Sequence, residues 1–355
     1  MRTLIQHARG KVPRQAHRDL DGAFEDELSR DGFDGRSALL YRAKDPTQAR
    51  ATGRFRTTLL QGNDLVPTDR DDPRGNAQRL FHNDDCSLWL SRRAESMPFY
   101  RRNVDGDECW FVHRGKGVVE TEFGPLCFEP GDYVVLPKAV THRWVMAGPD
   151  AFLFGCETVG ELRAPTYAGL GRYAPFDSDV VRIPAPAPGL LQAAEYEVRV
   201  KYDGEDSALF YHDHPCEVLG WKGDLFPFAF NVRDWNVVMS DTLHLPPTMH
   251  CFLTAPGVNL INLLPRPAET VRGVERLPWF HRNADYDEVV LIHGGKAMGR
   301  AMPTGVITHE PQGLHHGFGE KIRRRAEEEW TQHSRMEWEI IMVETRRPLK
   351  VDVAP

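Results

Sequence analysis

"PGDYVVLPKAVTH", residues 130–142, is the stretch of sequence that says most about the fold. It opens on a Pro-Gly turn, continues as an apolar run of strand length, and closes on Pro137 and the terminal His142. Runs rich in valine and aromatic residues that are bounded by proline and glycine are typical of β-strands joined by turns. The stretch therefore predicts strand, turn and a histidine at the end of the turn.

The same pattern occurs again in "GVITHEPQGLHH", residues 305–316. Counting from the glycine that opens each copy brings the two prolines together and places His316, not His315, opposite His142. A second pair of segments precedes these: "RRNVDGDE" (101–108) and "HRNADYDE" (281–288) are identical at five of eight positions. A solenoid needs roughly three or more repeats, so two copies predict two duplicated β-barrels in one chain.

The rest of the chain also favours β-structure. "YEVRVKY" (196–202), "VNLINLLP" (258–265), "DEVVLIHGG" (287–295) and "MEWEIIMVET" (336–345) are rich in valine, isoleucine and aromatic residues, which favours strands. Only residues near 17–30 and residues 320–333 look helical. The fold class that follows is mostly β, as a sandwich or a barrel.

"RIPAPAPG", residues 182–189, has the proline-alanine alternation of a stiff linker and lies between the two copies. We therefore expect residues 1–185 to form an N-terminal arm with a first barrel, and residues 186–355 to form a second barrel. The first 60 residues are polar and irregular, which indicates an arm that wraps around the rest of the chain.

Composition excludes several classes of function. The chain has 355 residues and a net charge of 44 − 51 = −7, so no large positive field favours nucleic acid or anionic membranes. No signal peptide and no apolar run of membrane-spanning length occur. The six cysteines form neither a CxxC pair nor a regular framework, which indicates reduced thiols. We expect a cytoplasmic protein.

The repeated pattern resembles the cupin superfamily, whose second motif has the form P-G-x-x-x-x-x-P-x-x-x-x-H. Residues 130–142 match that form at every fixed position. The resemblance implies a double-stranded β-helix, or jelly roll, in each half. The expected fold is thus an all-β bicupin with few helices.

The second copy offers a set of metal ligands: His281, Glu288 and His316. Two imidazoles and one carboxylate on one face leave coordination positions open, as in non-haem Fe(II) oxygenases. Spacing alone does not bring the three together; the cupin resemblance implies that they converge. A structural alternative is that they are hydrogen-bonded polar groups at strand ends. With His316 as the ligand, His315 is expected to have a supporting or core role.

The first copy differs at one ligand position, where Arg101 stands in place of His281. A guanidinium stays protonated and cannot ligate a cation, although it can pair with Glu108 and supply positive charge instead. Both this interpretation and a solvent-facing Arg101 predict a first barrel without metal. A competing ligand pair, His212 and His214, shares one face of a strand, but Pro215 follows at once and disfavours a strand there.

The second half resembles one family more specifically. "WKGDLFPFAFNVRDW", "HLPPTMH", "WFHRNADYDEVV", "GLHHG" and "MVETRRPL" occur in the order and spacing of homogentisate 1,2-dioxygenase over roughly residues 210–350. "FYRRNVDGDECWFVHRGKG" fits the same family less tightly. The resemblance implies Fe(II)-dependent cleavage of a hydroquinone-type aromatic acid by O₂, as in aromatic catabolism and tyrosine degradation. It also implies a homo-oligomer, a trimer or a hexamer.

Matched position by position, the resemblance implies His281, Glu288 and His316 as iron ligands and His244 as the base that takes the substrate's phenol proton. A histidine suits that role because imidazole titrates near neutral pH. Asn283 matches a position near the substrate, though asparagine also caps turns well. Tyrosines that animal-type members carry are absent here, and Phe280, beside Trp279, is expected to form a more apolar substrate wall.

Two other functions remain open at the level of sequence. A non-enzymatic bicupin that binds a metal or ligand, as a regulator or storage protein, would carry the same barrel. A Mn or Zn isomerase would use the same ligands, since the trio does not select the ion alone. The substrate is equally open: homogentisate, gentisate or a related ring.

Overall fold

The computed structural model describes residues 7–30, 32, 35–165, 178–242, 245, 250–276, 279–329 and 331–353. Across these residues strands dominate, and the two α-helices are short: α1 (Thr68–Asp71) and α2 (Glu320–Glu328). Two 3-10 turns, η2 (Ser178–Val180) and η3 (Val232–Asp234), complete the described helical structure. None of the described helices has the length and apolar character needed to span a membrane.

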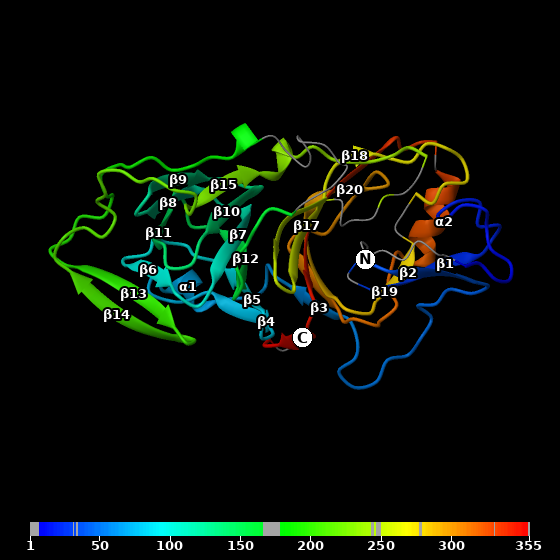
Figure 1. Cartoon of the computed structure of the whole chain (residues 1–355), viewed down its shortest axis with the longest axis horizontal. Helices are drawn as coiled ribbons and strands as arrows, with labels where there is room; N and C mark the ends of the chain where they lie inside the picture. The colour runs from blue at the N-terminus through cyan, green and yellow to red at the C-terminus, as the bar shows by residue number, and fades with distance from the viewer. Residues whose placement is uncertain are drawn as a thin grey trace.

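The first barrel consists of two sheets (Figure 1). A seven-stranded sheet runs in the order β15 (Phe228–Asn231), β10 (Asp132–Leu136), β7 (Asp107–Arg114), β12 (Phe152–Thr158), β5 (Cys86–Ser91), β4 (Gln78–His82) and β24 (Lys350–Val351). A six-stranded sheet runs in the order β14 (Glu205–Tyr211), β13 (Tyr196–Tyr202), β6 (Tyr100–Asn103), β11 (Thr141–Met146), β8 (Gly117–Thr121) and β9 (Gly124–Phe128).

The second barrel lies beside the first along the long axis of the molecule (Figure 1). Its main sheet runs in the order β16 (Cys251–Ala255), β17 (Val258–Leu263), β23 (Arg335–Thr345), β20 (Asp287–Ala297), β22 (Val306–Glu310) and β3 (Thr58–Gln61). Two short strands extend it, β18 (Arg266–Pro267) on β23 and β21 (Arg300–Ala301) on β20. A three-stranded sheet has the order β19 (Phe280–Asn283), β1 (Phe24–Ser29) and β2 (Ser37–Arg42).

These sheets confirm the expected all-β bicupin with few helices. The strands expected at 196–202, 258–265, 287–295 and 336–345 appear as β13, β17, β20 and β23, and the helix expected at 320–333 appears as the shorter α2.

The helix expected near residues 17–30 is wrong, because this segment contains β1, which pairs in parallel with β19. The segment looked like an exposed helix because it is acidic, yet Glu25, Asp26 and Glu27 are all buried. Each has a partner: His17 on Glu25, Arg42 on Asp26 (2.5 Å) and the indole of Trp279 on Glu27 (2.6 Å). A buried carboxylate without such a partner would cost several kcal/mol.

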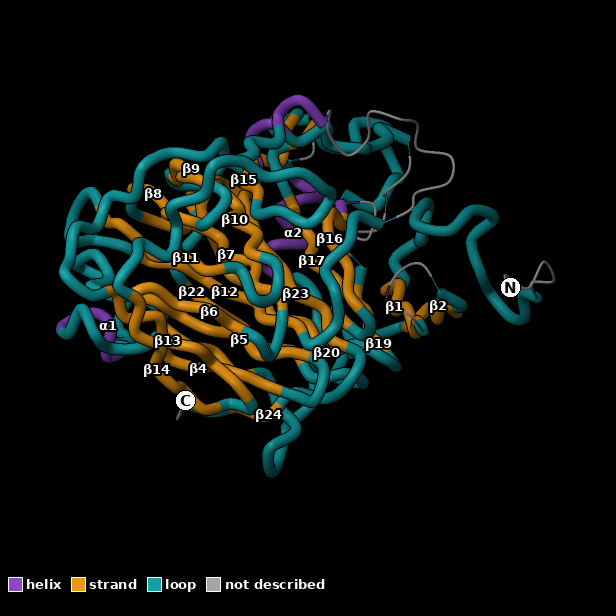
Figure 2. The backbone as a smooth tube through the Cα atoms, turned by 60° about the vertical axis from the view of Figure 1, so that its left-hand side comes forward, coloured by secondary structure: helices purple, strands orange, loops and turns teal. Residues whose placement is uncertain are grey.

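The two barrels exchange strands at both ends of the chain. The arm contributes β1 and β2 beside β19 (Figure 2), and β3 pairs with β22 of the second barrel. In the opposite direction β24 pairs with β4 of the first barrel. Strands β13, β14 and β15 also pair within the first barrel although they follow residue 185. The change in sheet pairing thus does not coincide with the expected boundary, and a division at residue 185 stays a prediction.

The interior is continuous from one barrel to the other. One cluster of buried apolar side chains includes Phe111 and Tyr133 from the first barrel together with Val289 and Ile341 from the second. The hydroxyl of Tyr133 donates a hydrogen bond of 2.6 Å to the side chain of Asn262 on β17. The shared core fixes the two barrels against each other, so each holds its own inward-facing site in a rigid frame.

Candidate metal centre

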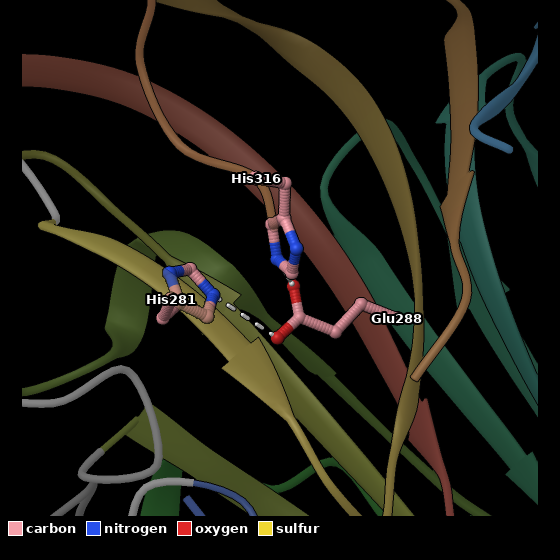
Figure 3. Close-up of side chains that lie close together, drawn as sticks. All are labelled: His281, Glu288 and His316. Atoms are coloured by element: carbon pink, nitrogen blue, oxygen red, sulfur yellow. Dashed lines mark hydrogen bonds and ion pairs between the residues drawn. The ribbon is translucent and has the colours of Figure 1, made fainter. Parts of the chain in front are cut away.

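The second barrel brings together His281 from β19, Glu288 from β20 and His316 from the loop after β22 (Figure 3). The backbones of His281 and His316 form an isolated antiparallel bridge, with two hydrogen bonds of 3.0 Å between their N–H and C=O groups. One potential ligand atom from each residue lies within 4.8 Å of the others. The backbone, and not a chance rotamer, therefore places the two imidazoles side by side.

Both imidazoles present the same nitrogen to Glu288. Nδ1 of His281 lies 3.1 Å from the carbonyl oxygen of Trp279, and Nδ1 of His316 lies 3.0 Å from that of Leu314. A carbonyl accepts only, so each Nδ1 carries the proton and donates. The Nε2 atoms face the carboxylate at 3.4 Å for His281 and 3.1 Å for His316. A backbone carbonyl on Nδ1 is the usual way in which a protein orients a metal-binding histidine.

Glu288 is held by a chain of hydrogen bonds that begins in the N-terminal arm. The amide of Asn283 donates to its Oε1, and the hydroxyl of Ser29 donates to Asn283 at 3.0 Å. Asn283 is 1% exposed and Ser29 is fully buried. Strand β1 thus fixes the amide that fixes the carboxylate, which gives Glu288 one orientation toward the two histidines.

Glu288 and His316 stabilise each other's charged forms. Burial acts to raise the pKa of Glu288, but His316 and His281 outweigh it and hold that pKa well below its ordinary value. Burial acts to lower the pKa of His316, and the Glu288 carboxylate outweighs it and raises that pKa to about 9. A cation at this position would take over the attraction that the two groups now exert on each other.

Two further carboxyl groups flank Glu288, one on each neighbouring strand. Glu310 on β22 and Glu344 on β23 are its direct cross-strand partners. Burial raises the pKa of Glu310 to about 7, while burial and the charge of Glu288 raise the pKa of Glu344 to about 8. Sequence reasoning missed both; the available signal was an acidic residue at or next to the C-terminal end of each strand.

Residues that are identical in the two copies of the motif make the same contacts in both barrels. Asn103 donates to Glu108 at 2.9 Å, as Asn283 does to Glu288. Asp107 accepts the backbone N–H of Lys138, and Asp287 accepts that of Gln312, each one residue after the motif's proline. These aspartates tie the histidine-bearing turn to the strand that carries the glutamate.

In the first barrel, Nδ1 of His142 donates to the carbonyl of Val140 at 3.2 Å, and its Nε2 lies 3.8 Å from Glu108. The third corner is Arg101, next to His142 across the β6–β11 pairing. The charge of Arg101 contributes to lowering the pKa of Glu108, after the opposing effect of burial and the larger effect of His142. The first barrel therefore has the same arrangement, with two residues of the kind that bind metals and one permanently charged arginine.

The other candidate histidines that the structure describes lie outside the cluster of His281, Glu288 and His316. His315 points away from the cluster, with Nε2 3.1 Å from Asp26 on β1. His214 hydrogen-bonds Tyr100 of the first barrel at 2.8 Å, and His212 is exposed. His244 is outside the described residues.

Phe280 is fully buried, but its ring lies against Phe24 of the arm and under the guanidinium of Arg323 on α2 (4.8 Å). Successive side chains of a strand point to opposite faces, so Phe280 faces away from His281 and Asn283. A role for Phe280 in holding substrate stays a prediction.

The chain matches known proteins along most of its length. A family model described as the N-terminal part of homogentisate 1,2-dioxygenase matches residues 81–232. A curated protein of Saccharolobus solfataricus named "Putative dioxygenase SSO1533" is 25% identical over 381 aligned positions, which cover 99% of this chain and 95% of that protein. The two matches support a cupin similar to homogentisate 1,2-dioxygenase.

Solved structures similar to this chain include the protein Ylba from E. coli, with a TM-score of 0.38 and 10% identity, covering 86% of this chain and 98% of that one. A cupin 2 conserved barrel domain protein from Leptotrichia buccalis has a TM-score of 0.38 and 9% identity, covering 81% and 96%.

We expect His315→Ala to retain the bound metal and His316→Ala to lose it. The reason is that only His316 directs Nε2 at Glu288, whereas His315 is occupied with Asp26. Elemental analysis after gel filtration would measure the difference. The reverse outcome would mean that the loop is shifted by one residue relative to the structure, which would exchange the faces of the two side chains.

Proposed function

We propose that the second barrel holds one Fe(II) ion through His281, Glu288 and His316 and opens the ring of a hydroquinone-type aromatic acid with O₂. The proposal rests on the convergence of two Nε2 atoms and one carboxylate. Backbone carbonyls that accept from the Nδ1 atoms fix the orientation of both imidazoles. The family and the relative's name support an oxygenase in general terms. The choice of iron as the ion and of a hydroquinone-type acid as the substrate is part of the proposal alone.

The donor set fits such an ion. Two neutral imidazole nitrogens and one anionic oxygen are the ligands of the facial triad, which suits non-haem Fe(II). Both Nδ1 protons are already used by backbone carbonyls, so each Nε2 has its lone pair available once its proton is displaced. When bound, the ion would supply Lewis acidity and adjacent open positions for a phenol oxygen and for O₂.

The chain's own residues have three tasks in this proposal. The Ser29–Asn283 pair keeps Glu288 in place, which fixes the open side of the site relative to β19 and β20. His244 accepts the phenol proton of the substrate, a role that is based on sequence similarity alone. Trp279, which precedes the first candidate ligand by two residues, is 2% exposed and limits the access of water along β19.

The class of substrate is inferred from what one ion with open positions can bind. A ring with para-related hydroxyls and an acid side chain next to one of them offers two oxygen atoms at a spacing suited to one ion. Homogentisate is one contender, and gentisate or a more apolar hydroquinone acid is another, because this chain lacks the tyrosines of animal-type members. The trimeric or hexameric assembly that the resemblance implies and the cytoplasmic location expected from composition stay predictions.

Oxygen consumption tests the proposal. Protein purified without air and loaded with Fe(II) should consume O₂ with at least one ring in a panel of homogentisate, gentisate and their 3,4-dihydroxy isomers, and the para-dihydroxy rings should be preferred. Parallel loading with Mn(II) and Zn(II) separates an iron oxygenase from an isomerase on the same ligands. Iron bound at one per chain with no O₂ uptake on any ring would replace the proposal by a metal-binding bicupin without oxygenase activity.

A further inference from the structure

The first barrel contains a cavity of about 160 Å³ at the position that corresponds to the metal centre of the second. Arg101, Glu108 and His142 lie at its base, and exposed residues of β14 and of the loop before β4 lie at its mouth. Its volume is close to the roughly 150 Å³ of an engineered protein cavity that takes up benzene. The space therefore fits one six-membered ring.

The walls of this cavity are aromatic. Trp110 and Trp144 stand edge to face, with ring centroids 6.2 Å apart, and Phe99 and Trp89 also line the space. Trp144 is 5% exposed and Phe99 1%. Large, rigid rings of this kind bind a flat ring at little cost in conformational entropy.

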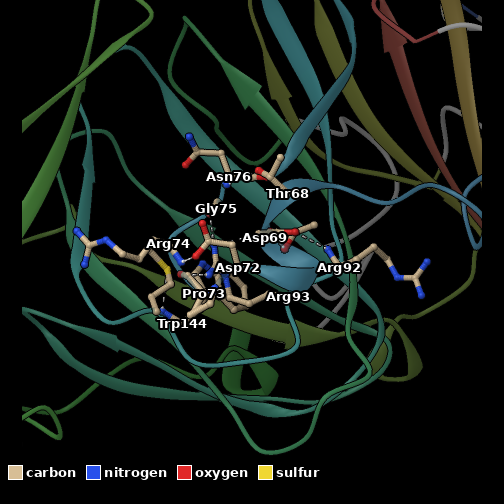
Figure 4. Close-up of polar contacts among 12 residues, drawn as sticks. Thr68, Asp69, Asp72, Pro73, Arg74, Gly75, Asn76, Arg92, Arg93 and Trp144 are labelled. Atoms are coloured by element: carbon tan, nitrogen blue, oxygen red, sulfur yellow. Dashed lines mark hydrogen bonds and ion pairs between the residues drawn. The ribbon is translucent and has the colours of Figure 1, made fainter.

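A loop fixed by a buried arginine covers one side. The guanidinium of Arg93 donates to the carbonyl oxygens of Pro73 (2.6 Å) and Gly75 (2.9 Å) and lies 3.8 Å from Asp69. Figure 4 shows these loop residues gathered beside Trp144. A Cβ at Gly75 would lie 2.4 Å from the Thr68 backbone, so the loop packs too closely to accept a side chain there. The cavity is thus a preformed space.

Three of the four acidic residues of the lining have partners inside the protein, and the fourth, Asp206, is exposed. Asp69 accepts hydrogen bonds from Ser91 (2.5 Å) and the backbone of Arg92 (3.1 Å). Glu157 is paired with Lys201. Glu108 accepts from Asn103 (2.9 Å) and from the indole N–H of Trp110 (3.2 Å). Arg93 and Lys201 thus offset the charges of Asp69 and Glu157, whereas Glu108 accepts hydrogen bonds from uncharged donors.

Arg101 is the exception among the charged residues at the base. Within the described part of the chain, its guanidinium has neither a hydrogen-bond partner nor a carboxylate within ion-pair distance. A partly buried arginine normally pairs with an anion, and its planar fork suits a carboxylate. The positive charge at the base of the cavity is therefore available to a ligand.

Beside Arg101 lies a pair of groups that accept hydrogen bonds. Nδ1 of His142 donates to a backbone carbonyl, so in the neutral ring Nε2 is an acceptor that faces Glu108 and the cavity. Burial lowers the pKa of His142, which favours the neutral ring. A hydroxyl group on a ligand would find an acceptor here, while a second carboxylate would be repelled by Glu108.

We propose that the cavity of the first barrel is a metal-independent binding site for a single-ring aromatic carboxylate that carries a hydroxyl group. The carboxylate pairs with Arg101, the ring lies against Trp110 and Trp144, and the hydroxyl donates to His142 or Glu108. The substitution of arginine for histidine then converts a metal site into an organic-anion site, and the first barrel is not merely a remnant. This site does not depend on what the second barrel binds.

Salicylate serves as the probe, with uncharged 2-hydroxybenzyl alcohol as its matched partner. Calorimetric titration and tryptophan fluorescence of the full chain carrying His316→Ala, which removes a candidate metal ligand of the second barrel, should show one salicylate per chain. The alcohol should bind at least about tenfold more weakly, because it lacks the charge that pairs with Arg101. Equal affinity for the two probes, or no binding of salicylate, would overturn the proposal.

Arg101→Gln should weaken salicylate binding about ten- to a hundredfold, the usual effect of losing a hydrogen-bonded ion pair. Arg102→Gln is the matched control: it removes the same charge one residue away, where the side chain donates to Thr141 instead, and should leave affinity within about twofold. Equal losses in both variants would indicate a diffuse charge effect and contradict a specific site. If Arg101→Gln does not fold, the comparison of the two probes still decides.

Discussion

Replacing His281 by arginine should abolish metal binding by the whole chain. The substitution reproduces in the second barrel what the first already has, where Arg101 accompanies Glu108 and His142. An arginine cannot ligate a cation, and its charge would compete for Glu288. Wild-type protein should contain one metal ion per chain by elemental analysis, and His281→Arg none. Loss of a ligand should exceed the roughly ten- to hundredfold loss of affinity that follows removal of an outer hydrogen-bond partner.

The control for this result is Glu108→Ala, which removes the equivalent carboxylate of the first barrel and should leave the metal content at one. Both variants alter a buried carboxylate–histidine cluster, so thermal unfolding of each should be compared with that of the wild type. Two ions per chain in the wild type, or metal retained in a folded His281→Arg or His316→Ala protein, would show that the ion is held elsewhere.

His244→Ala should keep the metal and lose turnover by about 10² to 10⁴ in kcat. The expectation follows from the role of a general base, which is needed for proton transfer and not for holding the ion. Metal content and steady-state oxygen uptake of the same preparation measure the two effects separately. The loss should be partly restored by added imidazole, which supplies an external base.

His212→Ala is the comparison for this variant, because His212 is exposed and lies in the segment that pairs with the first barrel. Its activity should equal that of the wild type. A His244→Ala protein with activity within a few-fold of wild type would remove His244 from the mechanism, and a protein without metal would reassign it to a structural role.

The repeated motif, together with the cupin resemblance, was sufficient to predict the fold class and the residues of the candidate site. Letters shared by the two copies turned out to be those that make the same hydrogen bonds: Asn103 and Asn283 to the glutamates, Asp107 and Asp287 to the histidine-bearing turns. The register counted from the glycine also chose His316 over His315, which agrees with the geometry. Local pattern was informative here because each contact lies within one copy.

Contacts between distant segments could not be predicted. Ser29 and Asn283 are 254 residues apart, and nothing in either local sequence indicates that one orients the other. The acidic segment that forms β1 looked like an exposed helix because its charges find partners only after the arm has wrapped around β19. The proline-rich segment marked a surface crossing, but three strands after it still pair with the first barrel, since pairing is decided by the sheet edge available in the folded chain.

In the proposed reaction, both atoms of O₂ enter an aromatic ring at the site formed by His281, Glu288 and His316. Mass analysis of the product formed under ¹⁸O₂ tests this most directly. We expect the ring-opened product of a para-dihydroxyphenyl acid to gain two labelled oxygen atoms, with one O₂ consumed per ring, and Glu288→Ala to form none. A product with one label or none, from protein that contains one iron per chain, would contradict it.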